Sequence, residues 1–225
     1  MNQTDPLCQK AYGLIREMIA TGALDPDTAL SERRLAETLG IGRTPVREAI
    51  KELTRDGLLS VSPMRGTFVR SLSLADLREI HEIRQALEGA AAFRAAQCGP
   101  GKALGRLADA LRALSARTEF DVDEAQRIGW DFHQALFDAT GNRRLIQMYE
   151  TLRAQNGLAL QGVPGYDAAR SRQAILEHLQ IFAAIETGDA EQARRRMWDH
   201  LAHALDARLR FIAGLAGEPQ QRTEP

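Results

Sequence analysis

Residues 31–53 constrain the fold of this chain more than any other stretch, because they read as two short helices joined by a tight turn. Ser31 can cap the first helix, since its hydroxyl accepts a backbone N–H that would otherwise lack a partner. Gly40 stands where a left-handed residue ends that helix. Thr44 then caps the second helix, and Pro45 falls in its first turn, where a missing N–H costs nothing. The stretch therefore predicts a helix-turn-helix.

The second helix of this pair has two different faces. Val46, Ile50 and Leu53 recur at helical spacing and form its expected buried face. Arg43 and Thr44 lie near its N-terminus, which is the end of a recognition helix that contacts base edges and phosphates. The pattern predicts DNA binding.

A short hairpin follows the two helices. Residues 57–62 and 67–70 have the composition of strands, and residues 63–66 form a tight turn between them. Two helices followed by a small hairpin make a winged helix-turn-helix, in which Arg65 lies at the wing tip, within reach of a DNA groove. Residues 28–30 are a candidate short strand that pairs with this wing.

The local charge supports the same interpretation. From residue 33 to residue 70 there are 8 basic and 4 acidic residues, a net charge of +4, whereas the whole chain has a formal net charge of −1. Single arginines usually belong to a solvated face, but a basic patch on a near-neutral protein is typical of a DNA-binding region.

Composition places the chain among globular proteins. Its 225 residues suffice for one large or two small domains. No apolar run approaches the roughly 20 residues of a membrane helix, and the N-terminus lacks the pattern of a secretion signal. Cys8 and Cys98 lack the spacing of metal or redox motifs, which fits a reducing cytosol. We therefore expect a cytoplasmic protein that does not bind membranes.

Long helical patterns replace the strand signals after a short linker at residues 71–73. Helices are expected at 7–21 in the first part and at 74–98, 101–117, 121–139, 142–160, 167–187 and 189–214 in the second. Six helices with short loops are typical of antiparallel bundles, whose ligand sites lie between facing helices. The sequence thus predicts a mainly α protein: a winged helix-turn-helix domain at 1–72, an antiparallel helical bundle at 73–216, and a disordered tail at 217–225.

Three histidines fall in different helices of the second domain. His133, His178 and His200 each have apolar neighbours at helical spacing, so they can converge in the core of a bundle. Three neutral imidazoles suit Zn²⁺, Ni²⁺ or a similar ion and leave positions for water or a ligand. A histidine on a helix is more often a structural or surface residue, so spacing alone leaves both interpretations open.

The order of motifs in the first domain resembles the DNA-binding half of GntR-family transcriptional regulators. The resemblance rests on Leu-Ser-Glu-Arg, Arg-Thr-Pro-Val-Arg-Glu-Ala and Arg-Gly-Thr-Phe-Val, and it runs from about residue 11 to residue 70. It implies DNA contacts at six residues: Arg33, Arg43, Thr44, Arg47, Arg65 and Gly66. Gly42 departs from the family pattern, because relatives often have a serine or threonine there that contacts phosphate.

The second domain resembles the C-terminal effector domain of FadR-type GntR regulators, the FCD domain. The resemblance is carried by the segments 132–136 (Phe-His-Gln-Ala-Leu), 177–178 (Glu-His) and 197–201 (Met-Trp-Asp-His-Leu), with 79–88 as the opening helix. In many members the three matching histidines and one aspartate bind a divalent metal at the floor of the effector cavity. The resemblance therefore implies a metal and an effector site in a domain that also forms the dimer.

This chain lacks the aspartate of that pattern, because Gly129 stands one turn before the first histidine. Asp131 is a poor substitute, since it lies about 200° around the helix from His133. Either the metal is bound more weakly by three histidines, or the chain has given up the metal and uses the cavity directly. In both cases the three histidines line the effector pocket.

Arg84 is the candidate anchor for an effector carboxylate, because its planar guanidinium suits bidentate pairing. The alternative is an ion pair with Glu88, four residues further along the helix. His81 lies one turn before Arg84 and either shares the cavity or faces water. His203 is expected to be an exposed neighbour of His200.

The sequence thus predicts a ligand-responsive transcription factor, a repressor as is usual in the family. It would bind a short palindromic operator as a homodimer, under the control of a small carboxylate such as an organic acid. A three-histidine metalloenzyme with an appended DNA-binding module is the alternative. It is disfavoured because the sequence has no Ser/His/Asp or phosphate-loop motif, and neither Glu177 nor Asp199 is an evident general base. A constitutive architectural DNA-binding protein is a third alternative.

Overall fold

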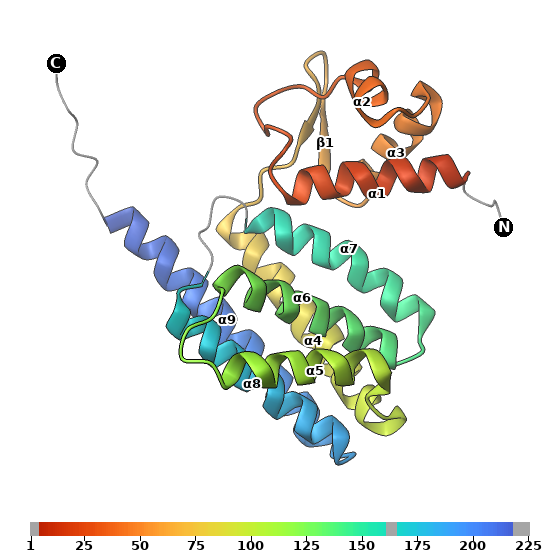
Figure 1. The fold of residues 1–225 in the computed structure, drawn as a ribbon. Helices are drawn as coiled ribbons and strands as arrows, with labels where there is room; N and C mark the ends of the chain where they lie inside the picture. The colour runs from red at the N-terminus through yellow and green to blue at the C-terminus, as the bar shows by residue number, and fades with distance from the viewer. Residues whose placement is uncertain (1–4, 161–165, 218–225) are drawn as a thin grey trace. The chain divides into compact units, whose positions relative to one another are not determined.

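A computed structural model describes residues 5–160 and 166–217, and this part of the chain forms nine helices and one two-stranded sheet. In chain order these elements are α1 Pro6–Ala20, α2 Glu32–Leu39, α3 Arg43–Arg55, β1 Leu59–Ser62, β2 Gly66–Val69, α4 Leu74–Cys98, α5 Gly101–Ser115, α6 Val122–Ala139, α7 Arg143–Ala159, α8 Ala168–Glu186 and α9 Ala190–Gly217 (Figure 1). The predicted fold class, an N-terminal winged helix with a helical C-terminal bundle, is confirmed. Among the described helices, none combines the length and the apolar character that a membrane span requires.

The contacts divide the chain into two units, which are described separately below. The first unit runs to Leu77 and also contains α7 from Glu150 onward, whereas the second contains Arg78–Tyr149, α8 and α9. The second half of α7 belongs to the first unit because Ala154 and Leu158 are buried in its hydrophobic core. The division therefore differs from the domain ranges expected from the sequence, which kept α7 whole.

In the helix pair of the first unit, the predicted ends of α2 are correct and the predicted start of α3 is not. Ser31 Oγ accepts a backbone N–H of α2 at 3.3 Å, and Gly40 ends that helix with φ of 61°. The predicted cap of α3 is wrong, because the helix begins at Arg43 and Thr44 already lies inside its first turn. Gly42 is the N-cap: its backbone is extended there, and no side chain caps the helix.

The wing is an antiparallel hairpin. Leu59 of β1 pairs with Val69 of β2, and the strands meet at a turn over residues 63–65. Residues 28–30 do not form the candidate third strand, and the backbone N–H of Leu30 instead donates one hydrogen bond of 2.7 Å to Thr67. A single bond of this kind holds the loop against the wing without extending the sheet.

The core of the first unit lies between the helices and the hairpin. Apolar residues of α1 and α3 are fully buried there, together with the residues that enter β1: Ile15, Ile19, Val46, Leu53 and Leu58. Tyr12 adds a polar tie by donating a 2.6 Å hydrogen bond to Asp56 at the end of α3. The periodic apolar face predicted for α3 is therefore the face that packs.

The helices of the second unit start and end close to their expected positions. Aspartates cap three of them, since Asp121, Asp167 and Asp189 accept backbone N–H groups at the starts of α6, α8 and α9. Helix α9 runs to Gly217 and so passes the expected end at residue 214, which places Gly217 in the helix rather than in the tail. The rest of the predicted tail, 218–225, lies outside the described residues.

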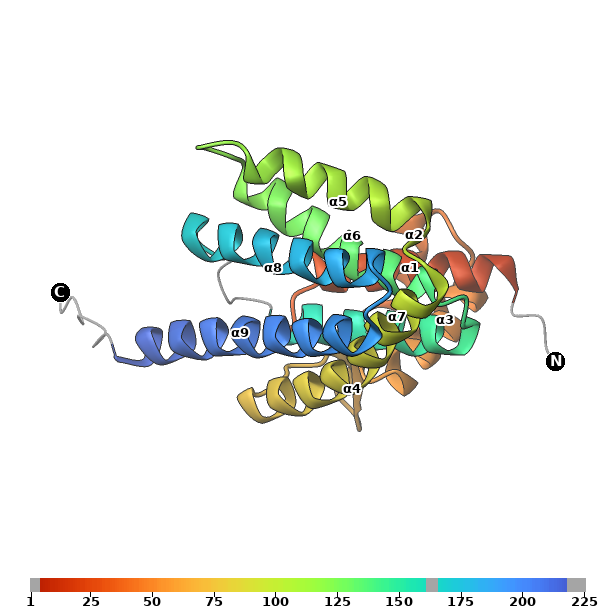
Figure 2. The same cartoon turned by 90° about the horizontal axis from the view of Figure 1, so that it is seen from below.

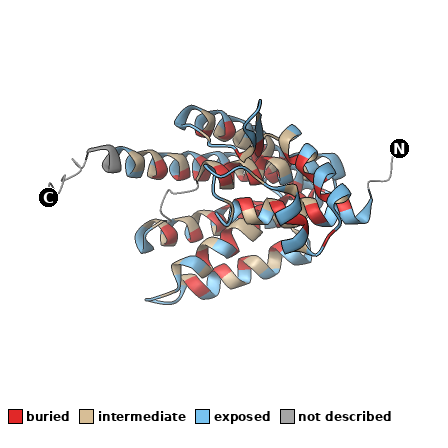
Figure 3. Ribbon diagram, turned by 90° about the horizontal axis from the view of Figure 1, so that it is seen from above, coloured by how far each residue is buried: buried red, intermediate tan, exposed pale blue. Residues whose placement is uncertain are grey.

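Helix α8 is central to the second unit, because it packs against α5, α6 and α9 (Figures 1 and 2). The inward faces contribute Leu111, Phe132, Ile181 and Leu201 to one core. Buried residues form stripes along the helices in Figure 3, as expected for amphipathic helices that share a core.

Helix α4 is held against α9 by a tryptophan. Trp198 Nε1 donates a 2.8 Å hydrogen bond to the backbone oxygen of Gln85. Gly89, one turn further along α4, makes this approach possible, because a Cβ at that position would collide with the indole ring. Helix α4 therefore needs a glycine where the pattern of a regular helix favours a larger residue.

Candidate functional site

The first candidate site is the outer face of the winged helix. All six residues expected to contact DNA are exposed: Arg33, Arg43, Thr44, Arg47, Arg65 and Gly66. Arg43 and Thr44 are the first two residues of α3, where free backbone N–H groups and the helix dipole favour an anion such as phosphate. The geometry is suited to contact with a nucleic-acid backbone.

Two of these arginines have acidic partners in the free protein. Arg47 Nε and Nη2 both lie 3.0 Å from Glu32 Oε2. Arg33 Nη1 lies 3.6 Å from Glu37. Both pairs are solvent-exposed, and such pairs contribute about 0–1 kcal/mol to stability. They therefore open easily when a phosphate or a base replaces the carboxylate.

The tip of the wing has an unusual backbone. Met64 is fully exposed and has φ of 64°, which is uncommon for a residue other than glycine. The Arg65 guanidinium lies 5.8 Å from the centre of the Phe68 ring. Gly66 has φ of 116°, and a Cβ there would lie 3.3 Å from Ala29, so the turn itself requires glycine. Its role in DNA binding stays a prediction.

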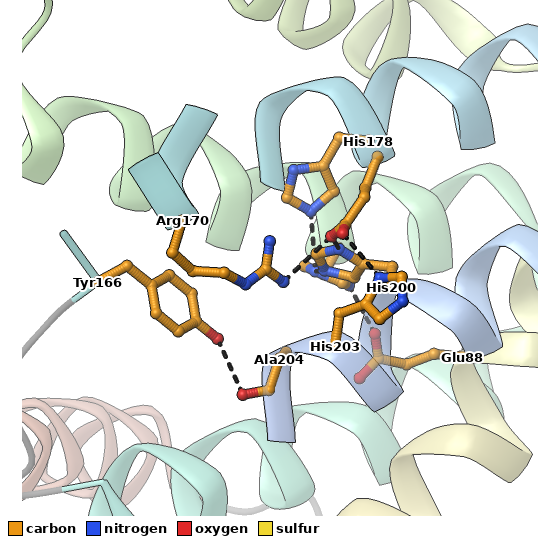
Figure 4. Close-up of polar contacts among 9 residues, drawn as sticks. Glu88, Tyr166, Arg170, His178, His200, His203 and Ala204 are labelled. Carbon is orange, nitrogen blue, oxygen red and sulfur yellow. Dashed lines mark hydrogen bonds and ion pairs between the residues drawn. The ribbon is translucent and has the colours of Figure 1, made fainter. Parts of the chain in front are cut away.

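The second candidate site is the meeting point of three helices in the second unit. Helices α6, α8 and α9 supply His133, His178 and His200, and each of these residues is only 4% exposed. His133 Nε2 lies 3.1 Å from His178 Nε2 and 3.2 Å from His200 Nε2. The structure thus brings the three predicted histidines together, with one nitrogen of each near the others. Figure 4 labels two of them, His178 and His200.

A carboxylate lies behind two of the three rings. His200 Nδ1 is 2.7 Å from Glu177 Oε2. His133 Nδ1 is 2.5 Å from Glu88 Oε2, although the ring N–H is not aligned for a regular hydrogen bond. His178 Nδ1 has no hydrogen-bond partner within the described part of the chain.

These contacts favour particular positions for the ring protons. A neutral imidazole carries one N–H, and a carboxylate oxygen close to Nδ1 favours this nitrogen as its site. The Nε2 atoms of His133 and His200 then present lone pairs to one another at 3.2 Å. A proton from His178 can bridge only one of the short nitrogen–nitrogen contacts, whereas a cation among the three rings satisfies them all.

Burial sets the charge of this cluster. It lowers the pKa of His178 well below its usual value, and the nearby His200 and His133 rings lower it further. Burial also lowers the pKa of His200 to about 4, although the hydrogen bond to Glu177 opposes this change. Burial would raise the pKa of Glu88, but Arg84 and His133 outweigh it and bring the value to about 2. At neutral pH the rings of His178 and His200 are therefore neutral, while the Glu88 carboxylate is ionised.

Position 129 of α6 offers the cluster no side-chain ligand atom. Gly129 lies against His178, and a Cβ at this position would be 3.1 Å from the Cε1 atom of that ring. Asp131 is 44% exposed and lies 3.6 Å from Arg127, on a different face of the helix. No aspartate or glutamate joins the three histidines in a metal-type group among the described residues.

Arg84 adopts the alternative that the sequence left open. Its Nε donates a 2.6 Å hydrogen bond to Glu88 Oε1, and the two side chains are 12% and 0% exposed. The guanidinium carbon also lies 5.8 Å from the centre of the Trp130 ring. The pair with Glu88 uses Nε, and among the described residues no other hydrogen bond to Arg84 is formed.

The other two histidines lie outside the cluster. His81 is half-buried, and burial together with the charge of Arg84 lowers its pKa. His203 is exposed as expected, yet its Nδ1 is 2.9 Å from Glu177 Oε1. Neither belongs to the group of converging nitrogens.

Sequence reasoning missed Glu177 and Arg170 as parts of this site. Glu177 contacts His200 and His203, and Arg170 Nη2 lies 3.1 Å from Glu177 Oε2. Figure 4 labels Arg170, His200 and His203. Arg170 and Glu177 are seven residues apart, two turns of one helix, which is a spacing that signals a shared face. The contact of Glu177 with α9 has no local signal, because it depends on how α8 and α9 pack.

Comparison with known families gives two matches. The family described as "FCD domain" matches residues 79–203, and the family described as "Bacterial regulatory proteins, gntR family" matches residues 7–69. The first match spans more than half of the chain and includes all three converging histidines. The second includes the helix pair and the wing.

Similar proteins are transcriptional regulators rather than enzymes. The HTH-type transcriptional repressor RspR of Escherichia coli (strain K12) is 30% identical over 203 residues, which cover 89% of this chain and 88% of that protein. The probable D-xylose utilization operon transcriptional repressor of Paenarthrobacter nicotinovorans is 32% identical over 214 residues, which cover 88% of this chain and 86% of that protein.

A solved structure supports the same assignment. E. coli McbR/YncC has a TM-score of 0.75 and 26% sequence identity, and the match covers 92% of this chain and 98% of that one. The fold, the two family matches and the relatives agree. The chain therefore belongs to the GntR family of bacterial regulatory proteins and is a transcriptional regulator with an FCD domain.

Proposed function

We propose that this protein is an effector-responsive repressor whose FCD domain binds a divalent metal ion and a small carboxylate. The observation that carries the proposal is the convergence of three buried imidazoles. The Nε2 atoms of His178 and His200 lie 3.1 and 3.2 Å from His133 Nε2. The rings of His200 and His133 each have a carboxylate oxygen beside Nδ1. Three neutral nitrogens in this arrangement suit Zn²⁺ or Ni²⁺.

The residues present fit such an ion with one place left open. His133, His178 and His200 would hold it, and Gly129 contributes no oxygen where other members of the family have aspartate. A bound ion supplies a positive charge that a carboxylate can contact. Because the protein provides no anionic ligand of its own, water or the effector carboxylate would complete the coordination.

Arg84 is the proposed second contact of that carboxylate. Its planar guanidinium donates only Nε–H to Glu88, so the amino groups are available for bidentate pairing. Trp130 beside it and Phe132 beside His178 supply an apolar wall, which favours an organic acid over an inorganic anion.

The winged helix is the proposed operator-binding surface. Arg43, Thr44 and Arg47 on α3 would contact bases or phosphates in the major groove, while Arg33 and Arg65 contact the backbone or the adjacent groove. One recognition helix reads only a few base pairs, so a homodimer on a short palindrome is expected. We infer that the protein acts in the cytoplasm, where that DNA is located.

The effector would act by a population shift. A ligand that binds one arrangement of the dimer more tightly changes the fraction of molecules able to bind the operator. The relatives named above as repressors favour release of DNA on effector binding, as in induction of a repressed operon.

A thermal-shift screen tests this function. Tag-free protein is scanned with small organic acids, each with and without Zn²⁺ or Ni²⁺, because a true ligand stabilises the folded state by mass action. We expect a hit that depends on the metal and lowers affinity for an operator selected from random DNA. Inorganic sulfate is the control for anion binding alone. If no acid changes either stability or operator affinity, the protein is a constitutive DNA-binding protein.

A further inference from the structure

The second unit contains two parallel chains of contacts that lead from an arginine through a carboxylate to a histidine. In one, Arg170 contacts Glu177, which contacts His200. In the other, Arg84 contacts Glu88, which contacts His133. Both carboxylates are buried or nearly so, with side-chain exposures of 11% and 0%.

A buried carboxylate needs compensation, and the arginine supplies it. Arg170 is itself only 11% exposed, and its Nε and Nη1 atoms have no hydrogen-bond partner within the described residues. Within the described residues, Arg170 forms one ion pair, which joins its Nη2 atom to Oε2 of Glu177. His203 contacts the other oxygen of this carboxylate, Oε1. Arg170 therefore offsets part of the cost of burying the Glu177 carboxylate.

We propose that Glu177 and Glu88 are positioning residues, which fix His200 and His133 in the tautomer that turns a bare Nε2 towards the centre of the cluster. A carboxylate that accepts the Nδ1–H of a histidine also fixes the orientation of its ring and raises the basicity of the opposite nitrogen. This inference rests on the proposed metal site, but it also predicts a property of the metal-free protein.

His178 differs from the other two histidines because no carboxylate of the described residues contacts its Nδ1, so it can be compared with them within the same cluster. Its Nδ1 has no partner among the described residues, and its ring is held by packing, with its centre 4.9 Å from that of Phe132. No carboxylate determines its tautomer. Two histidines of the cluster are thus fixed by polar contacts, and the third is free to place its proton on either nitrogen.

Glu177 is the better residue for a test, because Glu88 is completely buried against Arg84. Glu177→Met removes the acceptor with little change in length, and Glu177→Gln keeps an acceptor oxygen without the charge. Glu186→Met is the matched control, since Glu186 is an exposed residue at the end of the same helix. His203→Ala tests whether the second histidine on Glu177 matters.

The first measurement uses the metal-free protein. Nitrogen-15 NMR of the histidine rings at neutral pH distinguishes the Nδ1–H from the Nε2–H tautomer. We expect His200 and His133 to be Nδ1–H in the wild type, and His200 to become a mixture in Glu177→Met. Glu177→Gln should restore much of the Nδ1–H form, while Glu186→Met and His203→Ala leave His200 unchanged.

The second measurement is the affinity for Zn²⁺ by competition with a chelating dye. Glu177→Met should weaken it by roughly 10–100-fold, the usual effect of an outer-shell change, and Glu177→Gln by less. If the wild type binds no Zn²⁺, the metal part of the proposed function fails and the tautomers alone decide this inference.

The inference is overturned if wild-type His200 is Nε2–H, or if Glu177→Met matches Glu186→Met in both tautomer and affinity. Should Glu177→Met fail to fold because Arg170 is left uncompensated, the double variant Arg170→Met/Glu177→Met replaces it. Replacing both members of a buried ion pair by apolar residues is usually tolerated.

Discussion

The two units of this protein hold their candidate functional side chains in opposite ways. In the winged helix, the six residues expected to contact DNA are exposed, and their acidic partners lie at the surface. In the helical unit, three histidines that are each 4% exposed face one another, and two of them contact buried carboxylates. At an exposed site, water screens the charges, so each side chain acts almost independently. At a buried site, each side chain depends on the others for its polar contacts.

This difference predicts how each site responds to substitution. Removing one exposed arginine leaves its neighbours solvated, so the loss is limited to the contact itself. Removing one member of a buried set leaves the others without a partner in a region that water does not reach. Removing a member of the buried cluster in the helical unit should therefore have a larger effect than removing one exposed arginine of the winged helix.

The largest effect is expected from His178→Ala. We expect Zn²⁺ affinity to fall by more than roughly 100-fold, beyond the range of outer-shell changes, because one of three nitrogen donors is lost. His178 is suited to this test because its Nδ1 makes no other hydrogen bond in the described residues. Calorimetric titration measures the affinity, with His81→Ala as the control for a histidine outside the cluster. Unchanged affinity would remove the three-histidine site.

Acid should destabilise the metal-free protein through the helical unit. The pKa of His200 falls from 6.5 to about 4 on folding, so below pH 6.5 the unfolded chain binds a proton that the folded one resists. Stability is then complete above pH 6.5 and decreases as pH falls towards 4, by up to about 3 kcal/mol for this group at about 1.4 kcal/mol per pKa unit.

Urea unfolding between pH 8 and pH 5 with a chelator present measures this loss. All five histidines of the chain lie in the second unit, which makes the comparison between units direct. His200→Gln should flatten the pH dependence, and His203→Ala, at an exposed position, should not. A wild-type stability that stays constant from pH 7.5 to pH 5.5 would contradict the buried neutral state.

A moderate effect is expected in the winged helix. Arg43→Ala should cost about 1–3 kcal/mol of operator binding, because the residue stands at the start of the recognition helix. Fluorescence anisotropy on a selected palindromic operator at fixed salt measures the change. Arg55→Ala is the matched control, since this exposed arginine lies at the opposite end of the same helix. Equal losses in the two variants would indicate a general charge effect without a specific contact.

The smallest effect is expected at Gly129. Gly129→Asp should tighten Zn²⁺ binding by on the order of tenfold, about 1.4 kcal/mol, because it restores an anionic ligand. The new Cβ would lie 3.1 Å from His178 Cε1, so this ring must shift by a few tenths of an ångström. It can do so because no hydrogen bond holds its Nδ1 in the described part. Gly129→Ala is the control for crowding, and equal behaviour of the two variants would show that the carboxylate does not reach the ion.

Local sequence rules predicted most of the fold. Ser31 and Gly40 bound α2 as expected, and α4 spans the predicted residues 74–98. Thr44 is the instructive failure. A threonine just before Pro45 has the composition of a cap, but Gly42 can begin the helix two residues earlier, because its extended backbone needs no side-chain acceptor there.

The sequence by itself determined the winged helix and the helical second part, because each of these depends on helical spacing, capping residues or a motif within one segment. For the three histidines, spacing left a structural role open, and the resemblance to a family pattern indicated that they meet. Only the tertiary structure decided that Glu177 of α8 reaches His200 of α9, that Arg84 is paired with Glu88, and that the second half of α7 belongs to the first unit. The physical reason is that these outcomes depend on which helix faces are buried together, even for Arg84 and Glu88 on one helix, and the energy of that packing is shared among many residues distant in the chain.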